Sequence, residues 1–367
     1  MNLGLFLAIG ESFEDLKKKG QLARVVDYNI KKYSQAFDKI YIFSYANETF
    51  QLPKNCVLVP NKTGLHRYLY APLIPLLHFR KILDCGILRG YQITGGIPCA
   101  IAKIFFGKPY VINYGYHYSK VASLENKKFQ ASAFPFIEMM VGFFADAVIV
   151  TSPDLLKYLA RVKKRKIHQF PSAGVDLKLF RPGIVSTKRN ILRIIYIGRF
   201  EAQKNLRSLI EAVGKIKKTK IKLTLAGEGS QKKELMSQAK NLSVNLEILP
   251  PQDYKNIPRL LCQSDIFTLP SQVEGNSKIL IEAMACGTPV IGANVEGVRQ
   301  IIKHKKTGIL CQTSPNSIKQ AIGYLIDPAT RFSIARNARE FIEKHYDFER
   351  LFQEEVDLLR KVADEKS

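Results

Sequence analysis

The chain has 367 residues, of which 46% are hydrophobic, and a formal net charge of +24 at pH 7. This length exceeds the roughly 250 to 300 residues at which one core usually stops growing, so two domains are expected, and the apolar content excludes an intrinsically disordered chain. The six cysteines form no Cys-x-x-Cys pair or cluster with His, which argues against zinc and disulfide frameworks, and no apolar run approaches the ~18 residues of a membrane span.

Short apolar runs alternate with helical patterns along the first half of the chain. The N-terminal run lacks a basic region and is followed by an acidic residue, so it predicts a strand rather than a signal peptide. Alternation of this kind predicts a parallel, doubly wound sheet. The expected strands are 3–9, 39–44, 56–59, 90–94, 110–114, 147–151 and 167–170, and the expected helices are 13–33, 65–83, 100–105 and 153–162.

A stretch rich in Gly and Pro without periodicity, Pro171 to Ile184, indicates a hinge between domains. A second alternation follows it and predicts a second sheet of the same kind. Its expected strands are 193–197, 221–226, 245–249, 265–269, one starting at 290 and 309–311, and its helices are 205–216, one ending near 239, 257–262, 277–286, 317–325, 329–345 and 348–363.

The segment PSQVEGNSKILIEAMACGTPVI, Pro270 to Ile291, carries two glutamates in a strand-loop-helix unit. The amides of Gly275, Asn276, Ser277 and Lys278 open the helix, and a helix N-terminus attracts phosphate. Glu282, farther along the helix, can accept the hydroxyls of a ribose, and Glu274 in the loop can accept those of a sugar. The pattern therefore suits a nucleotide sugar, and two solvated glutamates on an ordinary unit are the alternative.

Basic and glycine-rich turns follow the first two strands of the second half. Gly198-Arg199, with Lys204 five residues on, places two cations where open α/β sheets bind ligands, and such cations can hold a diphosphate. Gly227 and Gly229 form a second turn that can line the base or the phosphates. Solvated basic residues and an ordinary glycine turn are the alternatives.

Together these motifs, and EAMACGTPVI above all, resemble the donor site of retaining glycosyltransferase family 4, also called glycosyltransferase group 1, which has the GT-B fold. This chain has Glu-Gly-Asn-Ser where that family usually has Glu-Gly-Phe-Gly. The resemblance implies two doubly wound Rossmann-like domains facing a cleft. It implies that residues 1–175 bind the acceptor, that 176–345 bind the nucleotide sugar, and that a helix in 346–367 packs back on the first domain.

The resemblance also implies roles for single residues. Arg199 and Lys204 would hold the diphosphate, Glu282 the ribose diol, and Glu274 the transferred sugar. In the first domain Gly10 would approach donor and acceptor, and His117, offset by two residues from the family position, would lie near the reacting carbon. An ordinary turn at Gly10 and an ordinary histidine are the alternatives.

The same resemblance implies front-face attack, in which the acceptor hydroxyl passes its proton to the departing phosphate. The chain contains no Asp-x-Asp, so we expect no metal and no cofactor, with Arg199 and Lys204 supplying the positive charge. Glu274 as a covalent nucleophile is the alternative.

Two stretches of the first half, Leu65 to Arg89 and Phe129 to Phe144, mix apolar and aromatic residues with cations. Such stretches bind anionic membranes, although buried core helices have the same pattern. A membrane would suit a lipid-linked or glycan acceptor, and we expect a cytoplasmic protein peripheral to the cytoplasmic face of a membrane. The cations concerned are Arg67, Arg80, Lys81, Lys127 and Lys128.

The predicted activity is retaining transfer of a sugar from a UDP- or GDP-sugar to an acceptor hydroxyl, in the synthesis of a cell-surface polysaccharide, lipopolysaccharide or glycolipid. A phosphorylase or a sugar-nucleotide epimerase with the same fold is the alternative. A binder of nucleic acid or another polyanion would use the net charge of +24, but the cations are scattered and no nucleic-acid motif is present, so no nucleic-acid partner is expected.

Overall fold

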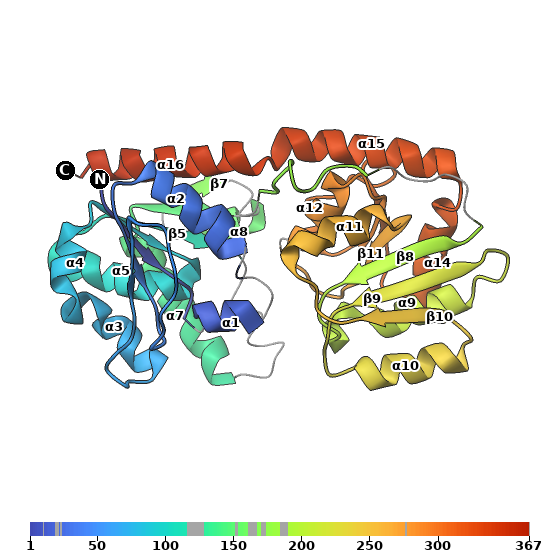
Figure 1. Cartoon of the computed structure of the whole chain (residues 1–367), viewed down its shortest axis with the longest axis horizontal. Coiled ribbons are helices and arrows are strands. Elements are labelled where there is room, and N and C mark those ends of the chain that lie inside the picture. Colours follow the sequence, from blue (N-terminus) through green and yellow to red (C-terminus); the bar gives the residue numbers. More distant parts are fainter. Residues whose placement is uncertain are drawn as a thin grey trace. The chain divides into compact units, whose positions relative to one another are not determined.

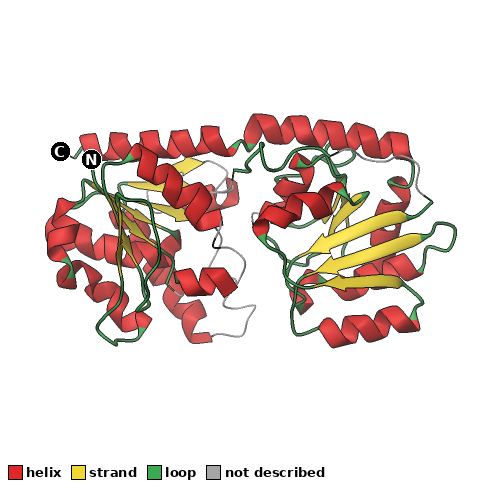
Figure 2. Ribbon diagram, in the orientation of Figure 1, coloured by secondary structure: helices red, strands yellow, loops and turns green. Residues whose placement is uncertain are grey.

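The computed structural model describes residues 1–9, 11–18, 22, 24–115, 128–150, 153–160, 167–169, 174–183, 190–275 and 277–366. The chain forms two compact units, Met1–Ser172 with Arg350–Ser367, and Ala173–Glu349. Each unit contains its own parallel sheet flanked by helices (Figures 1 and 2). The residues from Arg350 onward belong to the same compact unit as the N-terminal half of the chain.

The sheet of the first unit has the order β3-β2-β1-β4-β5-β6-β7 in the described residues, with every pair parallel. Its five inner strands are buried, which explains their continuous apolar runs, and β3 at one edge is half-buried. The strands are β1 (Leu3–Phe6), β2 (Ile40–Phe43), β3 (Cys56–Val59), β4 (Ile87–Gly90), β5 (Tyr110–Tyr114), β6 (Ala147–Val150) and β7 (Ile167–Gln169).

Helices cover this sheet. They are α1 (Phe13–Lys18), the π-helix η1 (Arg24–Ile30), α2 (Lys31–Ala36), α3 (Arg67–Leu77), α4 (Phe79–Asp84), α5 (Gln92–Phe106), α7 (Lys128–Phe144), α8 (Pro153–Ala160) and α16 (Phe348–Asp364). Within 13–33 the described residues form α1, the π-helix η1 and the start of α2, and the helix expected over 65–83 is divided at His78 between α3 and α4.

The strand predicted at 90–94 is wrong, because the strand is Ile87–Gly90 and α5 begins at Gln92. A charged residue, Arg89, interrupts the apolar run and hides the strand in the sequence pattern. In the structure Arg89 is only 2% exposed. Its Nε donates to Oε1 of Glu355 at 2.6 Å, so a residue from the other end of the chain neutralises its charge.

The C-terminal helix α16 packs on the first core through one apolar side. Val356, Leu359 and Ala363 are buried in the same cluster as the strands of the first sheet. Tyr33 of α2 donates its hydroxyl to Oε1 of Glu355 at 2.5 Å, and Arg360 donates to the carbonyl of Ala36. Apolar burial and a buried ion pair together attach this helix to the first unit.

The sheet of the second unit has the order β10-β9-β8-β11-β12-β13 in the described residues, again all parallel. The strands are β8 (Leu192–Ile197), β9 (Ile221–Ala226), β10 (Asn245–Leu249), β11 (Ile266–Leu269), β12 (Val290–Ala293) and β13 (Ile309–Cys311). The helical segments are η2 (Ala202–Lys204), α9 (Leu206–Gly214), α10 (Lys232–Asn241), η3 (Tyr254–Asn256), α11 (Ile257–Cys262), α12 (Lys278–Ala285), α13 (Glu296–Arg299), α14 (Pro315–Tyr324) and α15 (Pro328–His345).

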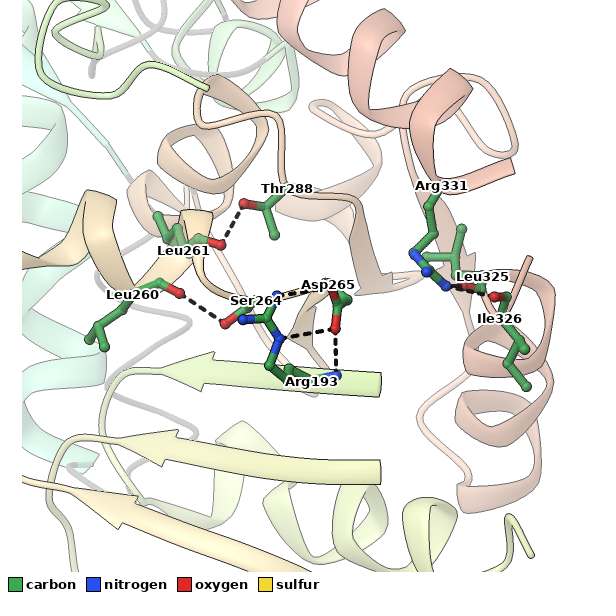
Figure 3. A network of polar contacts seen from close by, with 9 residues as sticks. All are labelled: Arg193, Leu260, Leu261, Ser264, Asp265, Thr288, Leu325, Ile326 and Arg331. Atoms are coloured by element: carbon green, nitrogen blue, oxygen red, sulfur yellow. Dashed lines mark hydrogen bonds and ion pairs between the residues drawn. The ribbon is translucent and has the colours of Figure 1, made fainter. Parts of the chain in front are cut away.

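This strand order places the switch point of the second sheet between β8 and β11, because the chain builds outward from β8 first to one side and then to the other. At the amino ends of these two strands Asp265 accepts from Arg193 through both carboxylate oxygens, at 3.0 Å from Nη2 and 3.2 Å from Nε (Figure 3). The backbones of the same two residues are also joined, with the amide of Asp265 donating to the carbonyl of Arg193 at 2.9 Å. The two strands are therefore held together at one end, and the loops at the other end fall at the switch point.

Candidate functional site

Three loops meet at the carboxyl ends of β8, β9 and β11. The amide of Phe200 donates to the carbonyl of Glu228 at 2.7 Å, and the amide of Gln272 donates to the carbonyl of Gln203 at 2.8 Å. The carboxylate of Glu201 accepts from the hydroxyl of Ser230 at 2.7 Å, which lowers the pKa of Glu201. The loop after β8 is therefore joined on one side to the glycine turn and on the other to the Glu274 loop.

The centre of this arrangement is an ion pair between two predicted site residues. Lys204 Nζ lies 2.5 Å from Glu274 Oε1, and the two side chains are only 16% and 11% exposed. The hydroxyl of Ser271 donates to the same oxygen at 2.7 Å. A cation and a carboxylate from different loops are thus fixed side by side at the switch point, where they can bind an anion and a hydroxyl respectively.

Asn205, which no sequence motif singled out, holds Lys204 in place. It adopts the left-handed conformation with φ of 56°, which asparagine tolerates better than most residues. Its side-chain nitrogen donates to the carbonyls of Pro270 at 3.1 Å and Thr313 at 2.8 Å. Asn205 is the N-cap residue of α9, but its side chain makes no capping bond to that helix.

The glycine turn after β9 is required by close backbone packing. A Cβ on Gly227, where φ is 145°, would lie 2.0 Å from the carbonyl oxygen of Gly198. A Cβ on Gly229 would lie 2.4 Å from the carbonyl oxygen of Phe200. The predicted residues Gly198, Gly227 and Gly229 therefore lie together where the first two loops cross.

The helix that follows the Glu274 loop begins at Lys278, with Ser277 as its N-cap. The side chain of Ser277 is buried and makes no capping bond, so it does not satisfy the first amides of α12. Glu282 is buried one turn into the helix. Gly275 is exposed in the preceding loop, and Asn276 lies outside the described residues.

Gly297 supports the Glu274 loop from the side, and sequence reasoning missed it. It is a buried residue of the short helix α13, and a Cβ there would lie 1.6 Å from the carbonyl oxygen of Gly275 and 2.5 Å from that of Glu274. In the sequence Gly297 follows Glu296 shortly after a strand, and a single glycine in such a place is too common to single out.

Arg199 differs from Lys204. Its backbone carbonyl accepts from the hydroxyl of Tyr196 at 2.9 Å, whereas its side chain is exposed and pairs with no carboxylate in the described part of the chain. The structure therefore joins Lys204 to Glu274 but does not join Arg199 to either.

Two predicted residues of the first unit, Gly10 and His117, lie outside the described residues. Neighbouring positions are described: the amide of Ile9 donates to the hydroxyl of Thr94 at 3.2 Å, and the amide of Gly115 donates to the side-chain oxygen of Gln92 at 3.2 Å. These bonds join the ends of β1 and β5 to the start of α5.

Clustered metal ligands and membrane-spanning helices are both missing from the part of the chain that the structure describes. Among these residues no group of three or more His, Cys, Asp or Glu side chains is arranged to hold a metal ion. No described helix is both long and apolar enough to cross a membrane.

Sequence comparison finds a family model and related proteins that match part of the chain. A family model described as "Glycosyl transferases group 1" matches residues 183–341, less than half of the chain. N-acetyl-alpha-D-glucosaminyl L-malate synthase of Bacillus anthracis is 32% identical over 161 residues, 43% of this chain and 42% of that protein. Glycogen synthase of Mycobacterium tuberculosis is 29% identical over 164 residues, 42% of this chain and 39% of that protein. The matched segments thus span less than half of these curated relatives.

Structural comparison covers the whole chain. Sucrose-phosphate synthase from Thermosynechococcus elongatus matches with a TM-score of 0.82 and 20% identity, over 99% of both chains. The Anabaena protein HepE in complex with UDP matches with a TM-score of 0.77 and 18% identity, over 98% of this chain and 100% of that one. At this identity the likeness concerns the fold, which is GT-B with two Rossmann-like domains, so the predicted fold class is confirmed.

Proposed function

We propose that the chain is a retaining glycosyltransferase that transfers a sugar from a nucleotide-diphosphate sugar to an acceptor hydroxyl. The observation that carries the proposal is the partly buried Lys204–Glu274 pair at the switch point of the second sheet. It lies within the segment that matches the group 1 family model, residues 183–341. A UDP- or GDP-sugar is the donor we expect, and HepE in complex with UDP-glucose is a structural neighbour that supports a UDP-sugar.

The proposed donor contacts follow from the charges of the site. Lys204 and Arg199 bind the diphosphate, and the amides of Gly275 to Lys278 add hydrogen-bond donors at the N-terminus of α12. Glu274 accepts hydroxyls of the transferred sugar, and Glu282 accepts the ribose diol. Because Glu274 already holds Lys204, the cation is placed before the donor arrives and little reorganisation is needed.

In the proposed reaction the acceptor oxygen forms a bond to the anomeric carbon on the face that the diphosphate leaves. The bond between that carbon and the diphosphate oxygen breaks, and the acceptor proton passes to the departing phosphate. Lys204 and Arg199 stabilise the negative charge that develops on the leaving group. Gly10 and His117 remain proposed contributors from the first unit, near the reacting carbon.

We propose that residues 1–175 bind the acceptor and that 176–345 bind the donor. A glycan or lipid-linked acceptor, used in the synthesis of a cell-surface polysaccharide, lipopolysaccharide or glycolipid on the cytoplasmic face of a membrane, fits the basic charge of the chain.

The test is incubation with a panel of nucleotide sugars and candidate acceptors, with release of nucleoside diphosphate and the product's anomeric configuration followed by NMR. Transfer without inorganic phosphate, with the donor configuration kept, supports the proposal. Strict dependence on inorganic phosphate would indicate a phosphorylase, and conversion of the donor without an acceptor would indicate an epimerase.

Substitutions at the candidate site are compared with a control substitution on the protein surface. Glu274→Gln and Glu282→Gln should each lower the rate at least about a hundredfold, because each removes a charged acceptor from the donor. Glu211→Gln removes an exposed carboxylate of α9 that pairs with Lys215, and it should leave the rate unchanged. Equal rates in all three variants would contradict the assignment of the site.

A further inference from the structure

The helix α3 is apolar on both sides. Its inner side is buried, including Tyr70 and Ile74, as expected for a helix packed on a core. Its outer side is also apolar: Leu69 is 63% exposed and Leu73, Leu76 and Leu77 are exposed at helical spacing from it. A helix that is apolar all round is normally buried on every side, whereas the outer side of α3 is exposed to solvent.

The exposed apolar surface continues onto neighbouring helices. Helix α3 lies between β3 and β4 in the chain, α5 between β4 and β5, and α7 between β5 and β6, and each of these connections leads in the same direction across the sheet. Because such crossovers are right-handed, the three helices lie on the same face of the sheet. Helix α5 packs against both α3 and α7, and Figure 1 shows α3, α4 and α5 together beside the first sheet. Exposed large side chains on the other helices are Phe79, Leu83, Ile104, Phe105, Phe136, Met139 and Phe143.

The charges on this surface are nearly all positive. Arg67 and Arg80 are exposed at the start of α3 and in α4, and Lys62 is exposed in the loop before them. These four helices contain two acidic residues, of which Asp84 accepts from the hydroxyl of Tyr41 at 2.7 Å and Glu138 is buried. We call the outward sides of α3, α4, α5 and α7 the basic apolar face.

We propose that the basic apolar face docks on an anionic lipid bilayer, with α3 lying in the plane of the interface. Leucine and aromatic side chains would enter the region between headgroups and acyl chains, while the cations contact the lipid phosphates. A second copy of the chain would present the same cations to this face and carry a net charge of +24, which opposes self-association. This inference rests on the proposed function for its membrane setting, and it adds which helices of the first unit contact the lipid.

The absence of tryptophan from the sequence allows a direct test. Tyr68→Trp places a single tryptophan on the basic apolar face, at a site 60% exposed, and Phe332→Trp places one on α15 of the second unit, at a site 72% exposed. Each full-length variant is mixed with phosphatidylcholine vesicles that either contain or lack phosphatidylglycerol. Brominated lipids then report whether the indole enters the bilayer.

The expected result is a blue shift and bromolipid quenching for Tyr68→Trp with phosphatidylglycerol present, and neither change for Phe332→Trp. Arg67→Gln with Arg80→Gln should weaken vesicle binding about 25-fold, since each cation near an anionic surface contributes about fivefold. Leu69→Gln with Leu77→Gln should also weaken binding while leaving the circular dichroism spectrum unchanged, because both residues are exposed.

Equal quenching of both tryptophans, or no vesicle binding by the folded wild type, would overturn the proposal. A concentration-dependent dimer in light scattering that the Leu69 and Leu77 substitutions abolish, without vesicle binding, would identify a second copy as the occupant instead. Nucleotide binding by the same variants is measured alongside, so that failure of the membrane proposal is distinguished from failure of the donor site.

Discussion

At the scale of single residues, the geometry of the candidate site depends on side chains and glycines that are not themselves proposed to contact the donor or the acceptor. Asn205 bridges the carbonyls of Pro270 and Thr313, and Ser271 donates to the carboxylate that holds Lys204. The sequence predicted Lys204 and Glu274 from their resemblance to a motif. It did not predict that they pair, because the contact joins residues 70 positions apart and depends on which strands are neighbours.

Gly297 gives the sharpest prediction at this scale. Gly297→Ala introduces a Cβ at the carbonyls of Gly275 and Glu274, so the loop must move away from α13. We expect nucleotide-sugar affinity to fall about tenfold and the free energy of unfolding to fall by about 1 to 3 kcal/mol. Titration of the donor and denaturant unfolding measure the two effects.

Gly323→Ala is the matched control, because no atom lies within 4 Å of a Cβ at this helical position. It should leave donor affinity unchanged and raise stability by up to about 1 kcal/mol. If Gly297→Ala bound donor as well as Gly323→Ala does, the loop would not depend on this contact.

His78 predicts a pH dependence of stability. Burial, together with the nearby Lys81, lowers the pKa of His78 below its ordinary value of 6.5. The folded state then binds fewer protons than the unfolded state, so the contribution of His78 is present above pH 6.5 and is lost as the pH falls through its lower folded pKa. We expect the free energy of unfolding to fall between about pH 7.5 and pH 5, and less steeply in His78→Gln. Identical slopes for the two proteins would rule out His78 as a source of the dependence.

At the scale of elements, the buried strands and the amphipathic helices of the second unit were predicted nearly residue by residue, as for β9, β10 and α11. The spacing of apolar residues, together with glycine or proline residues at the ends, is enough to predict such elements. The error at β4 fell where a tertiary contact overrides the local pattern. Arg89 interrupts the run of β4, and its buried charge is compensated by Glu355 of the C-terminal helix.

That ion pair predicts how α16 is attached. Glu355→Gln leaves the guanidinium of Arg89 buried without a compensating charge, and we expect a loss of about 3 kcal/mol in the free energy of unfolding. Glu354→Gln, one residue away, removes only an exposed pair with Arg350 and should cost less than about 0.5 kcal/mol. Denaturant unfolding of the two variants compares them, and equal losses would show that the Arg89–Glu355 pair does not anchor the helix.

At the scale of the whole molecule, the chain contains two units whose sheets follow the same order from the first strand outward. The length and the repeated alternation of strands and helices predicted this architecture. The identity of the donor and the acceptor could not be predicted in the same way, because it depends on a few side chains in loops. The resemblance that suggested the activity also covers mainly the second unit.

The central claim is that the carboxyl ends of β8 and β11 bind a nucleotide-diphosphate sugar through Lys204 and Glu282. Isothermal titration of the full chain with UDP-, GDP-, ADP- and dTDP-sugars tests it most directly, with Lys204→Ala, Glu282→Ala and the surface control Glu211→Gln alongside. We predict that one nucleotide binds to the wild type and the control, and that both site variants weaken it by at least about tenfold, equivalent to about 1.4 kcal/mol. If no nucleotide sugar bound at millimolar concentration, or if both variants bound it as tightly as the control, the proposed donor site would be wrong.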